Sequence, residues 1–146
     1  MKLFFLALLA LSANAIASQV DEVSGCYKLA LSPWRPANRH GPDDVYITPP
    51  SIVRLTAKPE PTWEPAAFLV EPALGAIPSV HSSAFWLLVG EGNIKIVWTT
   101  GFSGLTMKLH LAKNGMRGTA ETFWDFPRVT QVSQVIATRV PCEPGS

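Results

Sequence analysis

The sequence predicts an all-β protein, folded as an antiparallel up-and-down β-barrel of about seven to eight short strands, with a β-sandwich as the alternative. Two observations support this fold class. Apolar and polar residues alternate with a period of two in several segments that are separated by turn residues. In addition, no segment after residue 17 shows a convincing helical period with caps.

The clearest strands are predicted at 94–99 and within 105–123. In both, apolar residues at alternate positions indicate one buried and one solvated face. Asn114-Gly115 offers the two left-handed positions of a tight turn, so 105–123 is predicted to be a hairpin. The weaker strands are predicted at 25–31, 51–57, 67–71, 85–89 and 129–140, of which 85–89 is apolar on both faces.

Residues 1–17 have the layout of a secretory signal peptide. Lys2 precedes an apolar run over 3–11, and small residues at 13–15 and 15–17 each offer an A-x-A cleavage site. The run is shorter than the about 20 residues that a transmembrane helix needs. We therefore expect a single domain over 18–146, secreted or periplasmic, with no membrane span.

Charge argues against a nucleic-acid partner. Without Lys2, eleven of the 12 basic residues remain and face 11 acidic ones. The Lys and Arg residues are scattered singly along the sequence, whereas nucleic-acid binding requires a concentrated basic face. Ten of the 13 prolines lie between Pro33 and Pro78, so this half is predicted to hold short strands and extended loops.

Cys26 and Cys142 are the only cysteines, one near each end of the mature chain. In an oxidising compartment such a pair is normally a disulfide, and here it would join the first and last strands. That closure favours a barrel over a sandwich. The alternative for Cys26 is a lipid anchor, because residues 23–26 resemble a bacterial lipobox, although Asp21 and Glu22 interrupt the apolar run before it.

Gly25-Cys26-Tyr27 opens the first strand, and Arg139 lies near the end of the last. In this the chain resembles the lipocalin and avidin (calycin) superfamily of small ligand-binding barrels, whose G-x-W ring closes the barrel floor beneath an arginine. The resemblance implies that Tyr27 and Arg139 meet inside, while Cys26 points outward. The alternative is that Gly25 is a turn residue and Arg139 a solvated charge.

The segment 98–104 links two strands through Gly101 and Gly104, with Phe102 between them. Together with 118–120 and the ending Pro141-Cys142, it is similar to a set of uncharacterised small secreted bacterial β-barrel proteins with no assigned activity. Phe102 is interpreted either as the lip of a ligand site or as a cap on the core.

Aromatic residues are the candidates for ligand binding. Five tryptophans are many for this length, and rings can line a cavity or fill a core. Small residues predicted to point inward, Gly118, Ala120 and Thr122, would leave space in the barrel. The candidate ligand-binding residues are Trp34, Trp63, Trp98, Phe102, Met107 and Trp124.

Catalysis receives little support. The sequence has no metal-binding histidine spacing and no G-x-S-x-G motif, and we expect neither a metal nor a cofactor. The polar residues considered for such a role, with a solvated face as the alternative, are His40, His81, His110, Asp43, Asp44, Glu121 and Asp125.

Three functions are ranked on these grounds. The first is a secreted, non-enzymatic barrel that binds a small apolar or amphipathic ligand. The second is a structural or interaction module of the cell envelope with a filled barrel, and the third is a hydrolase. Cavity volume separates the first two, because a cavity of about 300 Å³ or more favours a ligand and a filled barrel favours a protein partner.

Overall fold

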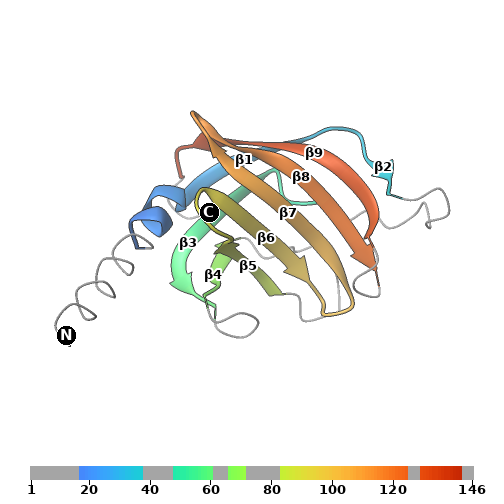
Figure 1. Ribbon diagram of the computed structural model, residues 1–146, viewed down its shortest axis with the longest axis horizontal. Coiled ribbons are helices and arrows are strands. Elements are labelled where there is room, and N and C mark those ends of the chain that lie inside the picture. The colour runs from blue at the N-terminus through green and yellow to red at the C-terminus, as the bar shows by residue number, and fades with distance from the viewer. Residues whose placement is uncertain (1–16, 38–47, 61–65, 72–82, 125–128, 143–146) are drawn as a thin grey trace, which may run out of the picture.

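The computed structural model describes residues 17–37, 48–60, 66–71, 83–124 and 129–142 (Figure 1). These residues form one short helix, 17–23, followed by nine strands. The strands are β1 (Gly25–Leu31), β2 (Arg35–Pro36), β3 (Ile52–Pro59), β4 (Phe68–Glu71), β5 (Ser83–Leu88), β6 (Asn93–Thr99), β7 (Ser103–Ala112), β8 (Gly115–Trp124) and β9 (Val129–Val140).

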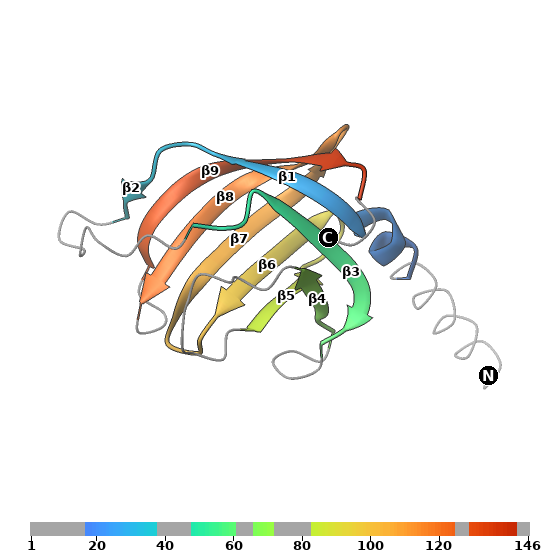
Figure 2. The same ribbon diagram turned by 180° about the vertical axis from the view of Figure 1, so that it is seen from behind.

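Eight of these strands close into a barrel. Antiparallel pairing runs in the order β1-β3-β4-β5-β6-β7-β8-β9, and β1 pairs in turn with β9, from Cys26 opposite Val140 to Leu31 opposite Val135. Figures 1 and 2 show this ring of strands from its two sides. The predicted up-and-down barrel is therefore confirmed. The sandwich alternative fails because β1 and β9 leave no open edge between two sheets.

The alternation of apolar and polar residues correctly predicted most of the strands. β1 and β9 have the predicted bounds, and β3 to β6 lie close to theirs. The short β2 was not predicted, and it pairs along β9 with Arg35 opposite Val132. The hairpin of β7 and β8 is present, but its turn residues are Lys113 and Asn114, one position earlier than expected, because Gly115 already pairs with Ala112.

Inward-facing side chains fill the barrel with one contiguous core. Trp86 and Trp98 are both fully buried, and the indole Nε1 of Trp86 donates to the backbone oxygen of Thr56 at 2.9 Å. The apolar outer face predicted for β5 is also present, since Phe85 packs in a second cluster with Ala67 and Val97. The main core contains Tyr27, Leu29, Val53, Leu55, Val70, Ile94, Ile96, Leu105, Met107, Leu109, Met116, Ala120, Val135 and Ala137.

Cys26 and Cys142 form the predicted disulfide, with their Cα atoms 5.2 Å apart. The bond closes a loop of 116 residues. For a loop of ~100 residues the chain-entropy model gives about 4.7 kcal/mol of stabilisation, an upper value that native strain reduces. The bond also occupies the Cys26 sulfur, which argues against the lipid-anchored alternative.

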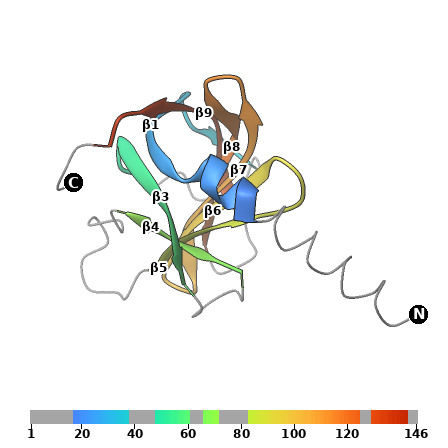
Figure 3. The same ribbon diagram turned by 90° about the vertical axis from the view of Figure 1, so that its left-hand side faces the viewer.

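The helix of residues 17–23 covers one end of the barrel (Figure 3). It was not predicted, because two turns are too short to show a periodic apolar face. Val20 and Val23 are buried in the main core, so tertiary packing stabilises a helix that would not persist alone. Residues 1–16 of the predicted signal peptide lie outside the described residues. Among those described, no helix is both long and apolar enough to cross a membrane.

The alternation in β7 predicts opposite effects for two neighbouring substitutions. We expect Leu109→Asp to unfold the domain, because Leu109 is 3% exposed and an unpaired buried carboxylate costs several kcal/mol. His110→Asp should be tolerated, because His110 is exposed on the outer face. Thermal melts of the two variants test this. An equal loss of stability in both would contradict the assigned faces.

Candidate ligand-binding site

The helix-covered end of the barrel is held together by backbone carbonyls at the end of the helix. The Tyr27 hydroxyl donates to the Val23 oxygen at 2.7 Å. The backbone nitrogen and the hydroxyl of Ser24 both donate to the Val20 oxygen, at 2.9 and 2.7 Å. These bonds satisfy acceptors that a helix otherwise leaves open at its C-terminus.

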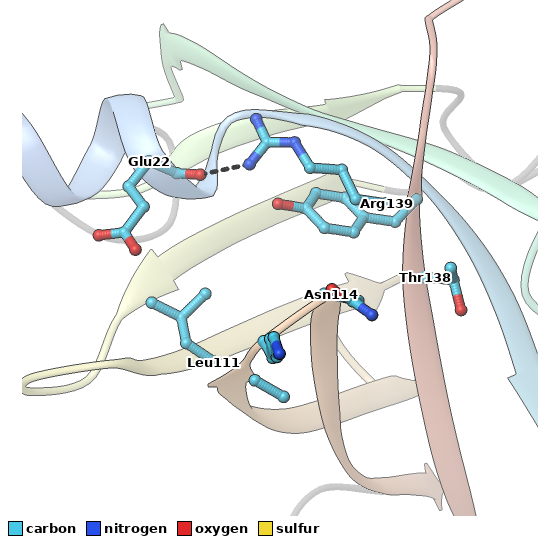
Figure 4. A pocket seen from close by; sticks show the side chains of 9 residues that line it. Glu22, Leu111, Asn114, Thr138 and Arg139 are labelled. Atoms are coloured by element: carbon cyan, nitrogen blue, oxygen red, sulfur yellow. Dashed lines mark hydrogen bonds between the residues drawn. The ribbon is translucent and has the colours of Figure 1, made fainter.

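Arg139 ties this helix to the last strand. It pairs directly with Tyr27 across β1 and β9, and its guanidinium carbon lies 5.7 Å from the centre of the Tyr27 ring. Its Nη1 donates to the backbone oxygen of Glu22 at 2.7 Å (Figure 4). Its Nη2 donates to the backbone oxygen of Ser24 at 2.6 Å. The guanidinium therefore joins the barrel closure to the helix through three contacts.

Gly25 makes room for this arrangement. Its φ of 151° favours glycine, and a Cβ at this position would lie only 2.9 Å from Nη2 of Arg139. The glycine that precedes the ring by two positions thus has a physical role in this chain, because it lets the cation approach the backbone of β1.

The Tyr27 phenol lies in an environment that disfavours its ionisation. Burial raises its pKa above the usual value near 10. The positive charge of Arg139 acts in the opposite direction and the negative charge of Glu22 adds to the increase. The phenol therefore stays protonated at neutral pH and remains a hydrogen-bond donor to the helix.

A pocket of about 440 Å³, here named the closed-end pocket, opens beside Tyr27 and Arg139. Figure 4 shows that its walls come from the helix, the β7–β8 hairpin and the end of β9. The lining residues are Glu22, Tyr27, Leu111, Ala112, Lys113, Asn114, Gly115, Thr138 and Arg139.

The closed-end pocket is amphipathic. The half-buried Leu111 and Ala112 supply apolar surface, while the exposed Lys113 and Arg139 supply positive charge and Glu22 a single negative charge. A pocket above about 300 Å³ with apolar walls and a few polar groups is typical of small-molecule sites. This arrangement can bind and orient a molecule with an apolar body and a polar head.

Of these lining residues, the sequence pattern indicated only Tyr27 and Arg139, as barrel-closure residues, and Asn114 and Gly115, as turn residues. The others went unrecognised because they come from three elements far apart in sequence. The Asn114-Gly115 turn signal located one wall, but nothing in the pattern indicated that a helix would lie opposite it.

The predicted ligand-binding aromatics do not converge on one site. Trp98 and Met107 are fully buried in the main core, and the half-buried Trp34 packs against it. Phe102 and Trp124 are 76% and 53% exposed, at the ends of β7 and β8 that lie away from the turn at residues 113–114. Phe102 therefore does not cap the core, as one interpretation proposed. Trp63 lies outside the described residues.

The small inward residues of β8 do not leave a void. Ala120 and Thr122 are fully buried, and the Thr122 hydroxyl lies 2.8 Å from that of Thr130. At Gly118 a Cβ would collide with the carbonyl oxygen of Lys108, so this glycine permits a close approach of strands. Among the described residues, the buried Nε1 of Trp98 has no hydrogen-bond partner.

The polar residues considered for catalysis are also dispersed. His110 is exposed on the outer face of β7, and Glu121 forms an ion pair with Lys108 at 2.8 Å. Within the described ranges, no three His, Cys, Asp or Glu residues gather as metal ligands. The remaining candidates, His40, His81, Asp43, Asp44 and Asp125, lie outside those ranges.

A double-mutant cycle measures the contact between Tyr27 and Arg139. We expect Arg139→Ala to lower the free energy of unfolding by about 1–2 kcal/mol, because it removes the ring contact and two hydrogen bonds to the helix. In a Tyr27→Leu background, which removes the ring and its hydroxyl but keeps an apolar side chain, the same change should cost less, because the ring contact is already absent while both hydrogen bonds of Arg139 remain. Denaturant unfolding of the wild type, the two single variants and the double variant gives the coupling free energy between the two side chains. A coupling free energy of zero would contradict the contact between Tyr27 and Arg139.

The raised pKa of Tyr27 predicts a loss of stability in alkali. As pH rises through about 10, the unfolded chain loses the phenolic proton while the folded protein retains it, so the free energy of unfolding falls. Tyr27→Phe should weaken this decrease, whereas lysine deprotonation affects both proteins alike. Unfolding curves measured between about pH 9 and 11 test whether the free energy of unfolding falls as expected. An equal decrease in the wild type and in Tyr27→Phe would refute the raised pKa of Tyr27.

A scan against family models and searches of curated proteins and of solved structures found no match for this chain. The resemblance to the lipocalin and avidin superfamily, and to secreted bacterial barrels, therefore stays a prediction. It depends on Gly25, Tyr27 and Arg139, whose mutual geometry in this protein is described above.

Proposed function

We propose that this protein is a secreted or periplasmic, non-enzymatic β-barrel that binds a small amphipathic ligand in the closed-end pocket. The observation that carries the proposal is the combination, in one pocket of about 440 Å³, of apolar surface from Leu111 and Ala112 with the charges of Lys113 and Arg139. The disulfide supports the extracytoplasmic location, because such bonds persist in oxidising compartments.

The charges of the pocket favour a ligand with a negative head group. Lys113 and Arg139 outnumber Glu22, and Arg139 uses one N–H of each terminal nitrogen on the helix carbonyls, which leaves further N–H donors. The apolar body of the ligand would lie against Leu111 and Ala112. A medium-chain carboxylate has this chemistry and serves as a probe.

Isothermal titration with sodium decanoate tests the proposal. Leu111→Trp should fill the pocket and weaken decanoate binding by roughly tenfold or more. The matched control is Leu31→Trp, because Leu31 is also half-buried against the main core but lies toward the opposite end of β1. Decyltrimethylammonium, which has the same chain length and a positive head, should bind more weakly than decanoate.

Two outcomes would overturn the proposal. The first is that decanoate does not bind. The second is that Leu31→Trp, and not Leu111→Trp, abolishes binding, which would place the ligand at the opposite end of the barrel. Mass spectrometry of protein purified natively from its own compartment then identifies the natural ligand.

The filled interior favours a second candidate function. Trp86, Trp98 and Met107 are fully buried, so the side chains of the described strands fill the barrel as expected of a structural or interaction module. Such a module would present its outer surface or rim to a protein partner. Retention of the native partner on the immobilised protein, in the absence of decanoate binding, would favour this alternative.

A further inference from the structure

The outer face of β6, β7 and β8 gathers four basic side chains that are separated in the sequence. Lys95 and Lys108 are direct cross-strand partners between β6 and β7. His110 and Arg117 are direct cross-strand partners between β7 and β8. Because Lys108 and His110 are two positions apart on β7, both pairs lie on the same face. We name these four residues the basic face.

The basic face is only partly neutralised. Glu121 pairs with Lys108 at 2.8 Å, and among the described residues no acidic side chain pairs with Lys95 or Arg117. Like charges placed directly opposite each other destabilise a strand pair. The repulsion between Lys95 and Lys108 therefore lowers the stability of the folded state. An anion bound between the two ammonium groups would reduce this repulsion.

A hollow of about 390 Å³ lies at the basic face. Lys95, Lys108 and His110 line it together with Asn93, and Val89 supplies an exposed apolar edge. The hollow shares no lining residue with the closed-end pocket. The alternation of β7 separates the two sites, because Leu111 points inward and His110 outward.

We propose that this hollow binds the tetrahedral oxyanion, a phosphate or sulfate group, of a small molecule. Lysine ammonium groups act as separate point charges with several donors each, which suits a compact dianion better than a planar carboxylate. The Asn93 amide nitrogen donates one N–H to the Glu91 backbone oxygen at 3.1 Å, and its second N–H and the His110 ring add donors at the same hollow. Arg117 lies beside His110 and adds to the positive field. The proposal is independent of the decanoate site.

Titration with inorganic phosphate, followed by amide chemical shifts at constant ionic strength, tests this site. We expect saturable shifts at Asn93, Lys95, Lys108 and His110. The double variant Lys95→Gln/Lys108→Gln should weaken phosphate binding by roughly tenfold or more. Its thermal stability should change little, because the double variant removes the like-charge pair together with the exposed ion pair of Lys108 with Glu121. A merely structural role for the two lysines would instead lower stability.

The matched control is Lys28→Gln/Arg54→Gln, which removes the same charge from exposed positions on the outer faces of β1 and β3. An equal loss of phosphate binding in this control would overturn the proposal in favour of non-specific attraction, and so would the absence of saturable shifts. A further experiment measures binding to vesicles of phosphatidylglycerol. Vesicle binding that requires Lys95 and Lys108, without saturable binding of free phosphate, would overturn the proposal in favour of a membrane surface.

Discussion

The pairing of β1 with β9 is the contact on which the rest of this structure depends. It joins the two ends of the described strand order and removes the sheet edges that would otherwise be exposed. The two strands are secured on both of their faces. Cys26 and Cys142 bond on the outside, and Tyr27 and Arg139 stack on the inside. Since these residues come from opposite ends of the chain, the closure pays a large loop-closure entropy, and the disulfide offsets that entropy by constraining the unfolded state.

The same closure creates the closed-end pocket. Arg139 contacts the Tyr27 ring, holds the helix end through two carbonyl oxygens and lines the pocket, so the side chain that stabilises this end of the barrel also belongs to the proposed ligand site. Gly25 is part of this assembly because a larger residue would push the guanidinium away. The filled interior explains the position of the pocket. Bulky side chains such as Trp86 are fully buried among the inward-facing residues, and the closed-end pocket lies at the end of the barrel.

Strand β7 serves two surfaces at once. Its odd-numbered residues, among them Leu109 and Leu111, point into the barrel, and its even-numbered residues, among them Lys108 and His110, point to the outer face. The inner series completes the core and one wall of the closed-end pocket, while the outer series forms the centre of the basic face. Basic residues that are scattered singly in the sequence thus become neighbours, because the register of β6 to β8 places them opposite one another.

The sequence by itself predicted all the strands but β2 from period-two alternation, and the disulfide from a single pair of cysteines in a chain expected to be secreted. The contact of Tyr27 with Arg139 was implied by the resemblance to lipocalins and avidins, and the structure contains it. Alternation depends only on residues that are neighbours in the sequence, so it can be recognised without knowledge of the fold. Tertiary structure alone decided the rest. The helix 17–23 is too short to show a pattern and forms because the barrel end buries its apolar side. Trp98 and Trp124 are the same residue type, yet one is fully buried and the other exposed, because burial depends on how far each lies from the rim. Both pockets combine residues from separate elements, and only chain packing brings such residues together.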